Sequence, residues 1–128
     1  MAVAVPVEKF RKDYKLPDYF IHTVDLTFKI FSGHTQVLSN LKVKQRSGVQ
    51  PNSPLILDAE DLVLNKVSID GKDLSSSEFA WTQADVLEIS GSLPEEFTLV
   101  TDVTIKPEEN TQLSGLYQSS GVYCTQCE

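Results

Sequence analysis

Thr23-Val24-Asp25-Leu26-Thr27-Phe28-Lys29-Ile30 is the stretch that decides the fold, because its polar and apolar residues alternate strictly. A period of two places every second side chain on the same face of an extended strand, so this stretch predicts a strand with one buried face. The alternation returns over residues 37–46. Ser32-Gly33-His34 between the two runs is typical of a hairpin connection.

Further strands are predicted at 54–58, 62–69, 86–89 and 97–105. Within the second of these, the inward phase slips between Leu64 and Val67, which predicts a β-bulge or bend. Asp70-Gly71 indicates a type I′ turn, because both central residues of that turn need positive φ. Pro107 should end the last strand, since proline has no N–H to donate to a sheet.

These strands recur at roughly ten-residue spacing, with Gly, Pro, Asn and Ser between them, and no long window has a helical period. The pattern predicts an all-β chain, built as an antiparallel β-sandwich or a saddle-like open barrel with few or no helices. Residues 1–17 should form an N-terminal arm, and residues 18–128 a single β-domain. The side chains expected to face the core are Leu26, Phe28, Leu41, Val43, Leu57, Leu99 and Val103.

The chain has 128 residues, a formal net charge of −7 and a pI near 4.7. An acidic domain repels phosphate backbones, so nucleic acid is not an expected partner. The sequence has no apolar run near the ~20 residues that span a bilayer and no basic patch, so no membrane contact is expected. Its start lacks the features of a signal peptide, which predicts a cytoplasmic protein, with organelle targeting by a missing segment left open.

Cys124 and Cys127 form a C-x-x-C pair, which can be half of a zinc site or a redox dithiol. A structural zinc site needs four ligands, and His22 and His34 have no zinc-motif spacing. A redox dithiol is expected before a helix, and none is predicted here. Two small side chains on an edge strand remain the favoured interpretation. We predict no catalytic residue, metal site or cofactor in this chain.

Gln126 and Glu128 are two residues apart, so on a strand their side chains point to the same face. An amide and a carboxylate on one face can bind an ammonium group. From spacing alone, however, two polar residues at a frayed terminus are the favoured interpretation.

Several segments, in their order along the chain, change that balance. Residues 11–19 and Thr23-Val24-Asp25-Leu26-Thr27-Phe28 resemble the opening segment and first strand of the aminopeptidase N family of zinc metallopeptidases. Leu55-Ile56-Leu57-Asp58-Ala59-Glu60-Asp61-Leu62 resembles the family's "LxLDgxDL" strand and turn. The most specific likenesses are Pro107-Glu108-Glu109-Asn110-Thr111 with the stretch 113–121, and Tyr123-Cys124-Thr125-Gln126-Cys127-Glu128, which resembles "(F/Y)CTQCE".

The resemblance implies that Gln126 lines the pocket for the substrate's first side chain and that Glu128 binds the free α-amino group of a peptide. It also implies zinc in the full-length parent, held by H-E-x-x-H and a downstream Glu. This sequence contains no H-E-x-x-H. The chain is therefore expected to be the N-terminal recognition and scaffold domain of an aminopeptidase, ending before its catalytic domain and inactive alone. Its expected partners are that catalytic domain and peptide N-termini. The alternative is an independent β-sandwich interaction module.

Overall fold

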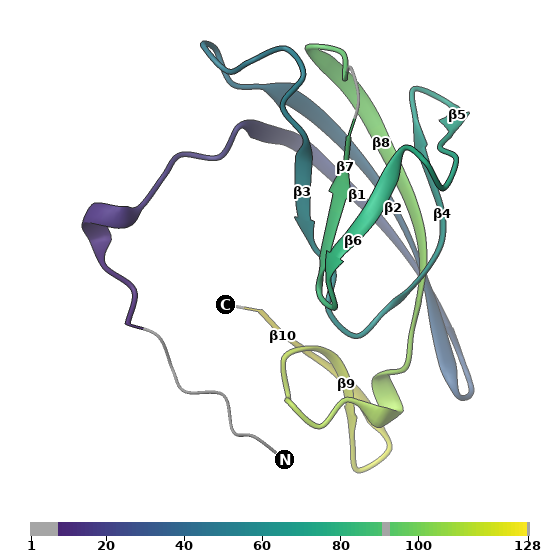
Figure 1. The fold of residues 1–128 in the computed structure, drawn as a ribbon. Helices are drawn as coiled ribbons and strands as arrows, with labels where there is room; N and C mark the ends of the chain where they lie inside the picture. The colour runs from purple at the N-terminus through teal and green to yellow at the C-terminus, as the bar shows by residue number, and fades with distance from the viewer. Residues whose placement is uncertain (1–7, 91–92, 128) are drawn as a thin grey trace.

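The computed structural model describes residues 8–90 and 93–127, which form strands, turns and two short 3-10 turns (Figure 1). In chain order the elements are η1 (Arg11–Asp13), β1 (Tyr19–Phe31), β2 (His34–Gln45), β3 (Leu55–Asp58), β4 (Val63–Ile69), β5 (Lys72–Asp73), β6 (Phe79–Gln83), β7 (Val86–Ile89), β8 (Glu96–Ile105), η2 (Pro107–Glu109), β9 (Gly115–Ser119) and β10 (Val122–Gln126). Among the described residues, no helix is long and apolar enough to cross a membrane.

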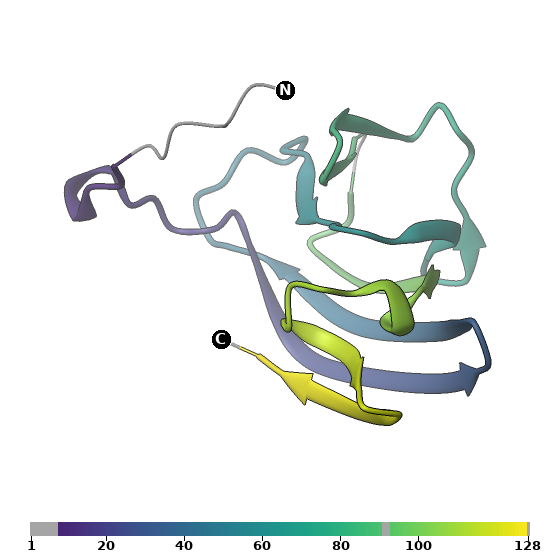
Figure 2. The ribbon, with the colours of Figure 1, turned by 90° about the horizontal axis from the view of Figure 1, so that it is seen from below.

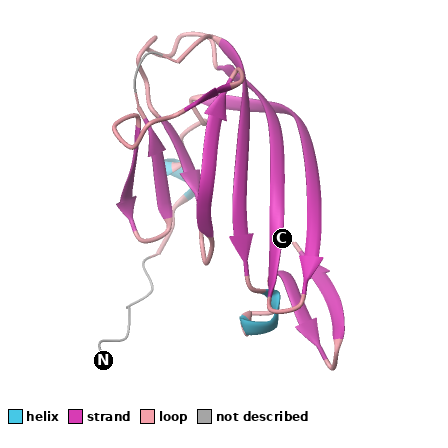
Figure 3. Cartoon of the chain, turned by 90° about the vertical axis from the view of Figure 1, so that its right-hand side faces the viewer, coloured by secondary structure: helices cyan, strands magenta, loops and turns pink. Residues whose placement is uncertain are grey.

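The strands form three antiparallel sheets. The large sheet has the order β1-β2-β8-β4-β5, a smaller one has the order β3-β7-β6, and β9 pairs with β10 in a separate hairpin. The small sheet packs against one face of the large sheet, and the hairpin lies at the end of the long strands (Figures 1 and 3). The prediction of an all-β, antiparallel, open fold is confirmed, because the large sheet runs from β1 to β5 without closing on itself.

The core forms where the two larger sheets meet. Its buried cluster comprises Tyr19, Val43, Leu55, Val67, Ile89, Phe97 and Leu99. Ile89 of the small sheet and Leu99 of the large sheet are completely buried. Full burial of such a side chain contributes about 1.5–3 kcal/mol. This cluster therefore holds the two sheets together.

Three local predictions from the sequence are confirmed. Phe31 pairs with His34 across the predicted hairpin connection. The register shifts between Leu64 and Lys66, where the bulge was expected. Asp70 and Gly71 have φ values of 50° and 83°, as a type I′ turn requires.

The residues predicted to face the core divide into two groups. Val43 and Leu99 are buried, Leu41 and Leu57 pack against the core cluster, and Val103 is half-buried. The two β1 members remain partly outside the core, since Leu26 is 51% exposed and Phe28 is 47% exposed.

The reason is the position of β1. Leu26 pairs with Ser39 and Phe28 pairs with the buried Val37, so both side chains project from the same face as the core. However, β1 is the outermost strand of the large sheet, and apart from Tyr19 at its start the buried core cluster consists of residues on other strands. The alternation correctly predicted the face but could not predict how far the second layer extends.

A register shift between Ile21 and Thr23 enlarges the exposed face. The extra residue, His22, brings the odd-numbered Ile21 and the even-numbered Val24 to the same side. The resulting β1 apolar strip consists of Ile21, Val24, Leu26, Phe28 and Ile30, whose exposed fractions are 47–56%.

The described part of the predicted arm, residues 8–17, leads away from the sheets and contains η1 (Figure 1). Where it joins β1, Arg46 Nε donates a hydrogen bond of 3.0 Å to the Pro17 carbonyl. The Arg46 guanidinium also lies 3.9 Å from an Asp18 carboxylate oxygen. These contacts fix the start of β1, while the domain boundary at residue 17 stays a prediction and residues 1–7 lie outside the described residues.

Candidate functional site

The terminal hairpin carries the predicted site. Strands β9 and β10 pair from Ser119↔Val122 to Gly115↔Gln126, around a turn at Ser120 and Gly121 with φ values of 51° and 80°. Gln126 is the last residue of β10, and its side chain is exposed. Glu128 lies outside the described residues, so its placement beside Gln126 stays a prediction.

One face of this hairpin is anchored to η2. The Tyr123 hydroxyl donates a hydrogen bond of 2.6 Å to Glu108 Oε1. Because side chains alternate along a strand, Cys124 and Gln126 point to the opposite face. Gln126 is therefore directed away from the anchoring contact. Cys124 is a half-buried free thiol and Cys127 an exposed one.

The loop between η2 and β9 is organised by Asn110. Its Nδ2 donates hydrogen bonds to the carbonyls of Ser114, at 2.7 Å, and of Leu116, at 2.9 Å. Its Oδ1 accepts a hydrogen bond of 3.0 Å from the Gln112 backbone N–H. The amide side chain thus satisfies backbone groups of the loop and of the first turn into β9, and it fixes where β9 begins.

The Glu108 carboxylate is held in an environment that favours its charged form. The hydrogen bond from Tyr123 lowers the pKa of Glu108, and the nearby backbone amides of Glu108 and Gly33 and the His34 ring lower it further. The same carboxylate raises the pKa of Tyr123, because it accepts a hydrogen bond from the protonated Tyr123 hydroxyl. Its other oxygen, Oε2, is shielded from solvent without a hydrogen-bond partner among the described residues.

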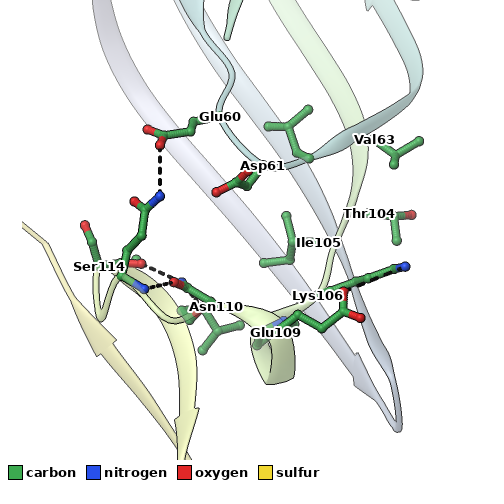
Figure 4. A pocket seen from close by; sticks show the side chains of 14 residues that line it. Glu60, Asp61, Val63, Thr104, Ile105, Lys106, Glu109, Asn110 and Ser114 are labelled. Carbon is green, nitrogen blue, oxygen red and sulfur yellow. Dashed lines mark hydrogen bonds and ion pairs between the residues drawn. The ribbon is translucent and has the colours of Figure 1, made fainter. Parts of the chain in front are cut away.

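A pocket of about 670 Å³ lies between the β3–β4 connection, the end of β8 and the start of β9 (Figure 4). Gln112 Nε2 bridges it by donating to Glu60 Oε1 at 3.3 Å. Lys106 and Glu109 form an ion pair of 3.9 Å at its rim. Polar and charged groups therefore line this pocket together with Ile105 and Leu116.

The histidines and cysteines do not gather with acids into a metal centre anywhere in residues 8–90 and 93–127, where no cluster of three or more His, Cys, Asp or Glu could hold a metal ion. His34 instead stacks on Phe31, with ring centroids 5.1 Å apart. Cys124 Sγ contacts the Val122 carbonyl at 3.6 Å.

No family model matches the sequence. Among curated proteins, it is 40% identical to aminopeptidase N of Escherichia coli over 123 residues, which is 96% of this chain. It is 39% identical to aminopeptidase N of Caulobacter vibrioides over 116 residues, which is 91% of this chain. The chain belongs to the aminopeptidase N family. It spans 13% of the length of each of these two relatives.

Solved structures agree with this assignment. A Legionella pneumophila aminopeptidase A, solved in complex with aspartic acid, matches 90% of this chain and 13% of its own, with a TM-score of 0.77 and 31% identity. A two-domain M1 zinc metallopeptidase bound to L-tryptophan matches 81% of this chain and 25% of its own, with a TM-score of 0.58 and 19% identity. That second likeness shows a shared fold only.

Sequence reasoning assigned no role to Glu108, Asn110 or Tyr123, although all three lie in the segments that resemble the aminopeptidase N family. A usable signal was present for Asn110. Asn side chains in loops often accept a hydrogen bond from the backbone two residues on, as Asn110 does from the Gln112 N–H. The Tyr123–Glu108 contact joins residues fifteen positions apart on different elements, and no local pattern predicts it.

Proposed function

We propose that this chain is a substrate-recognition and scaffold domain of a zinc aminopeptidase that removes N-terminal amino acids from peptides. The observation that carries the proposal is the 40% identity to aminopeptidase N of Escherichia coli across 96% of the chain. The exposed position of Gln126 at the end of β10 supports it, because this end of the hairpin is free to contact another domain.

In this proposal Glu128 binds the α-ammonium of the peptide, and Gln126 contacts the first side chain. An aminopeptidase must distinguish a charged N-terminus from an internal peptide bond. A carboxylate in a cleft that excludes water does so through a charge-assisted hydrogen bond, which is shorter and stronger than a neutral one. Because the hairpin is anchored, it would hold these two groups at a fixed position.

The hydrolytic chemistry itself is assigned to another part of the longer protein. Zinc activates water and polarises the scissile carbonyl in such enzymes, and it needs three protein ligands and a general base. Zinc is the metal that the resemblance to the aminopeptidase N family implies, so it belongs to the proposal for the full-length protein. This chain would contribute binding and orientation.

The scaffold role rests on the β1 apolar strip. Its five side chains extend the core face beyond the small sheet and are about half exposed. An exposed apolar surface that continues a core favours contact with another protein surface. Because the aminopeptidase N relatives are several times longer than this chain, we assign the strip to packing against the remainder of the same polypeptide.

A domain-swap chimera tests the proposal. The matching stretch of Escherichia coli aminopeptidase N would be replaced by this chain, and hydrolysis of amino-acid anilides measured. The chimera should be active, and Glu128→Ala should lower kcat/KM by roughly tenfold to a hundredfold, as expected for the loss of a hydrogen bond between charged groups of about 1.5–3 kcal/mol. Gln126→Ala should act more weakly, and its effect should vary with the substrate's first side chain.

Cys124→Ser and Cys127→Ser are the controls, and they should leave the kinetics nearly unchanged. The proposal is wrong if Glu128→Ala keeps kcat/KM within about twofold while a cysteine control abolishes activity. An independent interaction module is the second candidate, because the β1 apolar strip would also suit a separate partner. That candidate predicts a folded chimera without peptidase activity.

A further inference from the structure

The terminal hairpin has few ties to the two larger sheets. It forms its own two-stranded sheet, and β9 and β10 pair only with each other in the described structure. An isolated two-stranded hairpin is marginally stable in water, so contacts outside its own ladder must fix its position. The question is which contacts do so.

The Tyr123–Glu108 hydrogen bond is the side-chain contact that ties β10 to another element. It is short, at 2.6 Å, and it joins a phenol to a carboxylate. Asn110 fixes the other strand through the Leu116 carbonyl, but it acts from the loop that immediately precedes that strand. Among the hydrogen bonds of the described side chains, only the tyrosine contact joins another element to the strand that ends in Gln126.

Glu108 itself lies on an element that is packed against the rest of the fold. Pro107 beside it is completely buried, and η2 lies against the start of β2. The carboxylate also faces Gly33 and His34, at the turn between β1 and β2. Its Oε2 is shielded and has no hydrogen-bond partner in the described part of the chain. Loss of the tyrosine hydroxyl would therefore leave a partly shielded carboxylate without its strongest partner, which is costlier than loss of a solvated contact.

We infer that Tyr123 and Glu108 are positioning residues, which hold β10 at a fixed place so that Gln126 and Glu128 meet the substrate. This inference rests on the proposed function and deepens it. The two residues touch neither substrate nor metal. They act through the placement of the strand end, and strand alternation keeps their contact on the face opposite to Gln126.

Amide hydrogen exchange in the 128-residue chain tests the structural half. Tyr123→Phe keeps the ring and removes the hydroxyl, and it should lower the protection of amides 115–126 by about threefold to tenfold, which is less than for a fully buried hydrogen bond to a charged group because Glu108 is only half-buried. Amides of β8 should keep their protection, which shows that the sandwich is intact. Tyr117→Phe is the matched control, because Tyr117 lies on the opposite face of the same hairpin and its hydroxyl does not take part in this contact.

Kinetics in the chimera test the functional half. Tyr123→Phe should lower kcat/KM when Glu128 is present and change it little in a Glu128→Ala background, because a residue that acts through Glu128 has nothing left to position. Tyr117→Phe should be silent in both backgrounds. A merely structural residue would lower activity equally in both.

The inference is overturned if Tyr123→Phe leaves the exchange of 115–126 unchanged, or if Tyr117→Phe loosens the hairpin as much. It is also overturned if the kinetic effects of Tyr123→Phe and Glu128→Ala simply multiply. Failure of the proposed function looks different: Glu128→Ala is then silent in an active chimera, whatever the exchange data show for the hairpin.

Discussion

Two leucines on one face of one sheet give the sharpest test of the scaffold role. Leu26 on β1 and Leu99 on β8 both project from the core face, yet Leu26 is 51% exposed and Leu99 is 0% exposed. Leu→Ala removes the same atoms at both positions, once from a half-exposed side chain and once from a buried one. The difference between their effects therefore measures how well the β1 apolar strip is covered.

In the isolated chain, Leu99→Ala should lower the free energy of unfolding by about 2–5 kcal/mol, the usual cost of removing a buried leucine side chain. Leu26→Ala should cost about 1 kcal/mol. Half of its side chain is already in water, so about half of the ~1.5–3 kcal/mol for full burial is at stake, and no closed cavity is left behind. In the chimera, where the strip is proposed to be covered, the cost of Leu26→Ala should rise toward that of a core leucine.

Urea unfolding followed by tryptophan fluorescence measures both variants in the isolated chain. With slopes of about 1–3 kcal/mol/M, the two midpoints should separate clearly. For the chimera, the rate of thermal inactivation compares each variant with its parent. The reasoning is refuted if Leu26→Ala costs as much as Leu99→Ala in the isolated chain. It is also refuted if Leu26→Ala costs no more in the active chimera than it does alone.

Three further predictions concern single features. Thr35→Val should raise the free energy of unfolding by about 1 kcal/mol, because the buried Thr35 hydroxyl has no hydrogen-bond partner among the described residues. Calorimetry measures this change, and a lower melting temperature of the variant would contradict it. Purified residues 1–128 should show no chelator-sensitive hydrolysis of amino-acid anilides, and such turnover in a preparation free of contaminating peptidase would contradict the assignment of the chemistry to another domain. The hydrogen bond between Tyr123 and Glu108 should depend on pH. The pKa of Glu108 is lowered from 4.5 and that of Tyr123 is raised from 10.0, so the stabilisation by this hydrogen bond is complete between pH 4.5 and pH 10.0. The stabilisation should be lost as the pH falls through the lowered pKa of Glu108 or rises through the raised pKa of Tyr123. Amide hydrogen exchange at residues 115–126 measures this loss, and Glu108→Gln should remove the loss on the acid side.

Local chemistry made much of this fold predictable. The alternation of β1, the slip between Leu64 and Val67 and the Asp70-Gly71 turn each depend on backbone geometry over a few residues. Phe79–Gln83 was not predicted as a strand, because Phe79-Ala80-Trp81 lacks a clean alternation and its pairing with β7 supplies the missing information. A strand defined mainly by its partner leaves little trace in its own sequence.

Burial was harder to predict than direction. Leu26 and Leu41 have the same alternating pattern and share a face, but only Leu41 packs against the core cluster. The difference arises from the width of the opposing sheet, which is a property of the whole fold. The partial coverage of β1 is therefore a result that required the structure.

The candidate site shows the same division. Gln126 could be placed on the face that it shares with Cys124 from strand period alone, whereas its proposed role depends on family resemblance. The anchoring contact between Tyr123 and Glu108 appeared only in three dimensions, since it joins a strand to a 3-10 turn. Contacts of this kind decide how the end of a strand is held.

Glu128 is proposed to recognise the charged N-terminus of a peptide. The most direct measurement is inhibition of the active chimera by an amino-acid amide and by its analogue without the α-amino group, in the parent and in Glu128→Gln. We predict that the parent prefers the amine, and that the substitution lowers this preference by roughly tenfold to a hundredfold while leaving binding of the amine-free analogue unchanged. An undiminished preference in Glu128→Gln would contradict it.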